Sequence, residues 1–372
     1  MLMRSFKFAA LIIFLAAAGA AAGSGDNSLI FGSAAYPLEI SVSPETAPGA
    51  VLYETPFSEI PSQDYDTILI QGEMPDPGVQ LQVRIKNGAA FKTYDKTAIH
   101  RFPGGRFWAK YKMGRRTGEP VKLALLNAGV SLRHTFTIYG AEAFRETLVK
   151  EIISAPAPAA YKPDPGFYLP AEMPFTVVRR GAWQAAPPSE PYTPHAPKIF
   201  TLHNTAGHYP KNYDEAVREM QFLQDYHQNG RGWIDLGYHF VIDPQGDIFE
   251  GRPVNVVGAH VRGRNDGNIG ISVMGNYHPP VSQKPTKETL YTFVEMGKYL
   301  KTAYNIDISS FYAHRDIGNT DCPGDELHAL MPELKSLIFA PAAPLPGPVL
   351  PLSVAIPPMN RPSLRQLLQS AE

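Results

Sequence analysis

A proline- and alanine-rich stretch, SAPAPAAYKPDPG at residues 154–166, divides the 372-residue chain into two parts with different patterns. The stretch has no apolar period and is typical of a semi-rigid linker. A chain of this length can bury the cores of two domains. We therefore predict a first domain at 30–150, a linker at 154–170 that holds the domains apart, and a second domain at 175–338. A second proline-rich stretch at 340–372 is expected to be an extended tail.

Short runs of alternating apolar and polar residues recur before the linker. Separated by turn residues, they stand at 67–72, 79–85, 107–113, 121–126 and 134–140. Several short strands at such spacing predict an antiparallel β-sandwich. The aromatic residues Phe107, Trp108 and Tyr111 fit either core packing or an exposed face on which sugars stack. Core packing is favoured, because aromatic residues are common inside any sandwich.

The pattern changes after residue 175, where predicted strands alternate with predicted helices. Strands are expected at 198–204, 238–243, 248–252 and 268–276, and helices at 212–229, 287–305 and 325–338. Such alternation is typical of an α/β domain. The fold class predicted for the chain is therefore an α/β domain with a mixed central sheet and flanking helices, preceded by the antiparallel β-sandwich.

The first 22 residues have the three parts of a secretory signal peptide. Arg4 and Lys7 are positive, residues 9–18 are uncharged and apolar, and small residues at 20–22 fit a cleavage site. We expect cleavage, with no stable membrane insertion afterwards, and a secreted or periplasmic protein; the alternative is an uncut membrane anchor. The 34 basic and 35 acidic residues nearly cancel, so no nucleic-acid partner is expected.

The chain has one cysteine, Cys322. Compartments outside the cytoplasm are oxidising, and an exposed free thiol there is an oxidation hazard. The cysteine is therefore buried and inert, paired with another chain, or bound to a metal. His203 and His314 each follow a predicted strand, so two imidazoles and a thiolate are available, which are ligand types suited to zinc. The spacing of these residues in the sequence does not decide between burial, pairing with another chain and metal binding.

Several sequence blocks occur in the order that one protein family shows. They are LHNTAG at 202–207, QDYHQNGRGWIDLGYHFVID at 224–243, NVVGAH at 255–260 and AHRDIGNTDCPGDEL at 313–327. Together they resemble the zinc-dependent N-acetylmuramoyl-L-alanine amidases of type 2, a family that includes the peptidoglycan recognition proteins. The resemblance covers about 175–338.

The resemblance implies that His203, His314 and Cys322 bind Zn²⁺. Some relatives have an aspartate at the last position, and Asp321 stands beside it here. Cys322 is nevertheless the residue directly before the Pro-Gly pair, so the thiolate is the expected ligand. Ligation would also explain why the chain keeps one thiol, because a metal protects it and lowers its pKa.

The activity implied is hydrolysis of the amide between the muramic acid lactyl group and L-alanine of the stem peptide, by zinc-activated water. The partner is then peptidoglycan, as muropeptides. Tyr238 is expected to stabilise the oxyanion and Thr320 to support it. The residues expected to contact substrate are Asn204, Thr205, Trp233, Arg252 and His260.

Several points stay open at this stage. The general acid is Tyr238, His260 or Glu250. The sequence EGRPVN at 250–255 departs from the family's pattern, so the preference for lysine or diaminopimelate in the stem peptide is open. A non-catalytic peptidoglycan-binding recognition protein is the alternative function. The first domain either targets the cell wall or acts as a spacer or docking module, and both alternatives stay open. A structural cell-wall protein that binds through the sandwich is a third class of function. The oligomeric state is unknown.

Overall fold

The computed structural model describes residues 28–32, 34–146 and 175–341. The predicted signal peptide, linker and nearly all of the predicted tail lie outside these residues. None of the helices within the described ranges is long and apolar enough to cross a membrane. We call residues 28–146 the β-region and residues 175–341 the α/β region.

The β-region is built of two antiparallel sheets, with strand orders β1-β9-β3-β7-β6 and β2-β8-β4-β5. The first sheet holds β1 (Leu38–Val42), β3 (Tyr65–Glu73), β6 (Ala98–Arg101), β7 (Arg106–Thr117) and β9 (His134–Phe144). The second holds β2 (Val51–Glu54), β4 (Val79–Asn87), β5 (Ala90–Tyr94) and β8 (Val121–Asn127), and the one-turn 3₁₀ helix η1 (Pro103–Gly105) precedes β7. That the region is a separate sandwich domain stays a prediction.

Apolar side chains of both sheets pack into one core, which includes Ile68, Val83 and Leu123. Phe107 and Tyr111 belong to this core, whereas Trp108 between them faces the opposite side of β7. All three side chains are almost fully buried, so the alternative of an exposed sugar-stacking face is wrong. Both faces of β7 are therefore covered.

The α/β region is built on one mixed sheet with the order β10-β13-β12-β14-β11-β15. β12 and β13 run antiparallel, and the other neighbouring strands run parallel. The predicted mixed central sheet is thus confirmed. Its strands are β10 (Val177–Val178), β11 (Ile199–Asn204), β12 (Phe240–Ile242), β13 (Ile248–Glu250), β14 (Asn268–Val273) and β15 (Phe311–Ala313).

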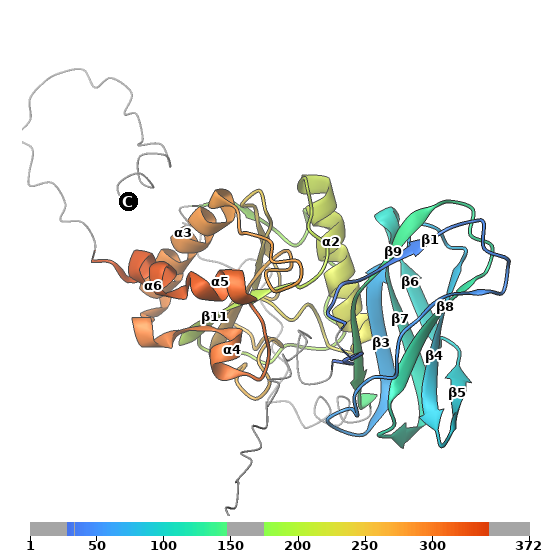
Figure 1. Cartoon of the computed structure of the whole chain (residues 1–372). Coiled ribbons are helices and arrows are strands. Elements are labelled where there is room, and N and C mark those ends of the chain that lie inside the picture. Colours follow the sequence, from blue (N-terminus) through green and yellow to red (C-terminus); the bar gives the residue numbers. More distant parts are fainter. Residues whose placement is uncertain (1–27, 33, 147–174, 342–372) are drawn as a thin grey trace, which may run out of the picture. The chain divides into compact units, whose positions relative to one another are not determined.

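Helices lie on both sides of this sheet (Figure 1). Successive strand residues point to opposite faces: Ile242 packs in the core that α3 and α6 complete, and Val241 in the core that α2 completes. The predicted last helix, 325–338, is two helices. The helices are α2 (Tyr213–Asp225), α3 (Lys287–Tyr304), α4 (His314–Ile317), α5 (Asp325–Ala329) and α6 (Met331–Phe339), with the π-turn η2 (Tyr226–Gly230) and the 3₁₀ turn η3 (Ile308–Ser310).

The β-region and the α/β region share a third apolar core and belong to one compact unit that ends at Phe339. Trp108 packs there and donates a hydrogen bond from Nε1 to Asp225 Oδ2 at 2.7 Å. Arg106 donates from Nε and NH2 to the two carboxylate oxygens of Glu219, both at 2.9 Å. The expectation that a linker holds two domains apart is wrong, because the five-stranded sheet packs directly on α2.

Candidate metal centre

His203, His314 and Cys322 meet at one edge of the mixed sheet. His203 is near the end of β11, and His314 directly follows β15, the parallel neighbour of β11. Parallel neighbours end at the same edge, so both imidazoles reach the same place. One ligand atom from each of the three residues lies within 4.8 Å of the other two. The Cys322 Sγ is 3.6 Å from His203 Nδ1.

The Cys322 thiol is buried, with an exposed fraction of 7%. Burial raises its pKa to about 12, although the Asn204 N–H, which donates to the sulfur at 3.3 Å, and Arg315 act in the opposite direction. The thiol therefore stays protonated at neutral pH unless a cation joins it. Its burial also makes a disulfide with another chain a poor explanation.

Hydrogen bonds fix which nitrogen of His203 carries the proton. His260 Nε2 lies 3.0 Å from the carbonyl oxygen of Asn268, which can only accept, so that nitrogen carries a proton. Neutral His260 then accepts through Nδ1 from His203 Nε2 at 3.0 Å. His203 Nδ1 is left without a proton, facing Cys322. Burial, followed by His314 and His260, lowers the pKa of His203 well below its usual value.

This donor set fits zinc. A protein site for catalytic zinc has three ligands and one further position, and ligating histidines are usually held through their second nitrogen. Here the second nitrogen of His203 is held by His260, and the third ligand is the chain's one thiol. The structure thus brings together the three residues that the sequence analysis assigned to the metal.

Tyr238 precedes β12, and its ring centroid lies 5.2 Å from that of His203. Burial, reinforced by Cys322, raises the pKa of its hydroxyl, while the neighbouring Ser272 hydroxyl lowers it by less. The hydroxyl therefore stays protonated and able to donate. Thr320 accepts a hydrogen bond from the Cys322 N–H at 3.2 Å and so steadies the loop of the thiol.

The residues expected to contact substrate fall into two groups: those near the candidate centre, and those that are buried and not open to a ligand. Asn204 and Thr205 leave the end of β11 and both bond to Gly275, Asn204 through its amide at 3.4 Å and Thr205 through its hydroxyl at 3.0 Å. Trp233 is half-buried and stacks on His227 with ring centroids 4.7 Å apart. Asn204 thus ends β11, Thr205 begins the loop after it, and Trp233 lies in the loop before Tyr238.

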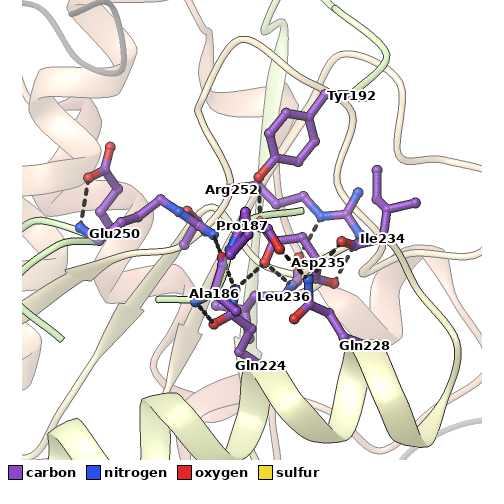
Figure 2. Close-up of polar contacts among 12 residues, drawn as sticks. Ala186, Pro187, Tyr192, Gln224, Gln228, Ile234, Asp235, Leu236, Glu250 and Arg252 are labelled. Carbon is purple, nitrogen blue, oxygen red and sulfur yellow. Dashed lines mark hydrogen bonds and ion pairs between the residues drawn. The ribbon is translucent and has the colours of Figure 1, made fainter. Parts of the chain in front are cut away.

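Arg252 and His260 are not open to a ligand. Arg252 is 4% exposed and donates to the backbone carbonyls of Asp235 and Leu236 (Figure 2). It also donates to the backbone carbonyl of Val257. It therefore holds together the loop that carries Tyr238, and the interpretation as a carboxylate-binding residue is not supported. His260 uses both ring nitrogens in the chain described above, behind His203 rather than beside it.

Asp235 organises the same loop from within (Figure 2). Its buried carboxylate accepts from the Tyr192 hydroxyl, from Gln224 Nε2 and from the Leu236 N–H, and pairs with Arg180 at 2.9 Å. The network joins the start of the α/β region to the segment before Tyr238. Its members are far apart in the chain, so no local sequence pattern marks this network.

The structure also narrows the candidates for the general acid. Glu250 accepts from the Arg180 N–H at 3.2 Å and lies 3.6 Å from the Arg179 guanidinium, at the β10 side of the sheet. With His260 engaged at both nitrogens, Tyr238 is the candidate that faces the metal ligands with a proton to donate.

Comparison with known proteins bears on what this arrangement does. The family described as N-acetylmuramoyl-L-alanine amidase matches residues 193–325. Peptidoglycan-recognition protein SC2 of Drosophila melanogaster is 31% identical over 166 residues, covering 43% of this chain and 87% of the relative. Peptidoglycan recognition protein 1 of Bos indicus is 34% identical over 161 residues, covering 42% and 82%.

Two solved structures are similar to part of the chain. Drosophila peptidoglycan recognition protein SD is 28% identical, with coverage of 43% and 94% and a TM-score of 0.40. The amidase LysC of Clostridium intestinale is 28% identical, with coverage of 40% and 93% and a TM-score of 0.34. These TM-scores are low, and the assignment rests on the sequence identities. The chain belongs to the family of type 2 N-acetylmuramoyl-L-alanine amidases and peptidoglycan recognition proteins.

Proposed function

We propose that the protein is a peptidoglycan hydrolase that cleaves the amide between the muramic acid lactyl group and L-alanine of the stem peptide. The observation that carries this proposal is the cluster of His203, His314 and Cys322, whose ligand atoms lie within 4.8 Å of one another. A protein that only binds peptidoglycan needs no such donor set. The relatives are named for peptidoglycan recognition, which supports muropeptides as the substrate.

Zinc held by these three residues would supply Lewis acidity and a water whose pKa is lowered to roughly 7. The chain's own contribution begins with the neutral, correctly protonated His203, whose Nδ1 is kept open by His260. Thr320 and the Asn204 N–H hold the thiol in place. These contacts hold His203 and Cys322 in the arrangement that the proposed site needs, which lowers the cost of assembling it.

Tyr238 is proposed to donate a hydrogen bond to the oxyanion that forms when the amide carbonyl is attacked. Its position beside His203 and its raised pKa both support this role. A donor that acts on the developing charge contributes to the rate rather than to substrate affinity. As the amide breaks, the leaving amine needs a proton, and Tyr238 is proposed to pass one to it and to regain one from the attacking water, which supplies the proton overall.

The site of action is proposed to be outside the cytoplasm, after cleavage of the signal peptide at residues 1–22. The second candidate function is a recognition protein that binds peptidoglycan without cleaving it, since the named relatives are recognition proteins. A defined soluble muropeptide separates the two. The amidase releases the sugar part and a peptide with a free L-alanine amine, both identified by mass spectrometry, and chelation stops their release. Tight binding of the muropeptide by zinc-loaded protein without either product would establish the recognition function instead.

A further inference from the structure

β9 carries an extra residue at the point where it faces the α/β region. In its register with β3, Gln71 pairs with Gly140 and Gly72 with Ile138, so Tyr139 between them has no partner. Ile138 and Ala141 both pack in the β-region core. Residues three apart on a regular strand would point to opposite faces. The register shift is a β-bulge, a device that re-aims side chains. It turns Tyr139 away from the β-region core.

The side to which Tyr139 turns borders a small cavity that reaches Cys322 of the candidate metal centre. From the β-region the cavity is lined by Ser28, Tyr36, Tyr139 and Gly140, among others. From the α/β region its lining includes Asn204 and Cys322. A wall of this cavity thus comes from residues outside 193–325, the part of the chain that matches the amidase family.

One end of this wall is tied to the loop that leaves β11. The Tyr139 hydroxyl donates to Glu73 Oε1 at 2.9 Å, and His208 Nδ1 lies 2.6 Å from the same oxygen. His208 stands in the loop after His203 and is itself 3.6 Å from Glu215 of α2. The ring of Tyr139 is therefore held at a fixed place relative to the strand of a metal ligand.

The other end is tied to the loop before Tyr238. Glu142 of β9 is buried, accepts from the Tyr226 hydroxyl at 2.8 Å and pairs with Arg231. The Arg231 guanidinium lies over the ring of Trp233, 4.9 Å from its centroid. The β9 wall is thus anchored to both loops that surround the candidate centre, which makes it a rigid part of the site.

We infer that Tyr139 and Gly140 form a wall of the substrate site, and that the β-region is a specificity-determining part of the enzyme rather than a tethered targeting module. The inference rests on the proposed function, and its ligand is the portion of a muropeptide next to the scissile amide. The Tyr139 ring offers a rigid apolar face for the C–H groups of that portion. Gly140 has no side chain, so the space beside the Tyr139 ring stays open.

The test uses the full chain and a defined soluble muropeptide. Tyr139→Ala removes the face and should raise KM about tenfold with kcat nearly unchanged, as the loss of a binding contact does. Gly140→Leu should raise KM by filling the space; a Cβ there would meet only Gln71, at 3.8 Å, so the strand can accept it. Phe91→Ala, an exposed aromatic on β5 of the other sheet, is the matched control.

Thermal unfolding and zinc content show that each variant is folded and metal-loaded. In folded variants, unchanged KM for both Tyr139→Ala and Gly140→Leu overturns the inference and leaves the amidase function standing. If the unmodified protein makes no product, the amidase proposal fails. Calorimetric Kd values for the same muropeptide then still test whether Tyr139 and Gly140 form a wall of the binding site. Weaker binding by Tyr139→Ala and Gly140→Leu supports the wall, and equal Kd values refute it.

Discussion

The α/β region and the β-region differ in where they carry the residues that lie near the candidate centre. In the α/β region, His203 and His314 stand where strands end. In the β-region, Tyr139 and Glu142 stand on the face of a sheet beside a bulge. Strand ends and loops collect ligand types in short recognisable motifs, whereas a residue on a sheet face looks like any other strand residue. A site can therefore be recognised from one region while a second region completes it.

The largest expected effect is on the free energy of unfolding. It comes from the buried ion pair between Arg106 of the β-region and Glu219 of the α/β region. Arg106→Leu leaves the fully buried Glu219 carboxylate without its partner, which costs about 3–5 kcal/mol. Urea unfolding at neutral pH measures this loss. Arg106→Leu combined with Glu219→Leu should recover much of it, because two apolar groups can replace a buried pair.

The control is Arg133→Ala, which removes an ion pair with Glu45 on the surface of the β-region, where both side chains are exposed. No measurable change is expected there. If Arg106→Leu behaves like this control, the two regions do not share a core in solution.

The second effect compares one chemical change in the two regions. Tyr238→Phe should lower kcat about 100- to 1000-fold, as the loss of an oxyanion donor does, with zinc content and KM little changed. Tyr94→Phe, the same change on β5 of the β-region and away from the cavity beside Cys322, should change neither parameter. Steady-state kinetics on one muropeptide measures both. A change in KM alone for Tyr238→Phe would make that residue a ground-state binder.

The third effect concerns the hydrogen-bond chain behind His203. His260→Leu removes the acceptor that fixes the proton on His203 Nε2, and loss of such a partner typically weakens metal binding about 10- to 100-fold. Competition with a chelator measures zinc affinity directly. His260→Gln, whose side-chain oxygen can accept, should restore part of it. His328→Gln, a partly exposed histidine elsewhere in the region, should bind zinc normally; equal affinity in all three variants would remove His260 from the site.

The smallest effect is a pH dependence at the contact between His208 and Glu73. Burial alone lowers the pKa of His208, but the Glu73 hydrogen bond and the charge of Glu219 offset it and raise the pKa overall. The contact therefore stabilises the folded protein fully below the unfolded pKa of about 6.5 and loses this effect as pH rises through the raised folded pKa. His208→Gln should lower Tm most below pH 6.5 and progressively less at alkaline pH. A deficit that grows with pH would show that the pKa is not raised.

The sequence was sufficient to predict the mixed sheet and the main helices, because these depend on local periodicity. The cluster of His203, His314 and Cys322 was predicted from the resemblance to the family, since the spacing of these residues left the metal open. The short strands β1, β2, β5 and β6 were not predicted, because each has only four or five residues and lies outside the sequence blocks of the family. β12 is shorter still, but one of those blocks contains it.

The contacts between the regions were not predictable in the same way. Arg106 and Glu219 are 113 residues apart, and Glu142 and Arg231 are 89 apart, so no local pattern marks either pair. His260 shows a further limit. The block NVVGAH at 255–260 identifies the residue. Only the structure shows that its ring contacts His203 and Asn268 and is not open to a substrate.

The most direct test of the account is the zinc content of the purified protein, measured together with turnover of a defined muropeptide before and after chelation. The account predicts one zinc per chain, loss of turnover on chelation, and recovery when zinc is returned. Cys322→Ser should bind little zinc and turn over little substrate, because a serine hydroxyl stays protonated and is a poor ligand. Full turnover by metal-free protein, or by His203→Ala, would contradict the zinc mechanism.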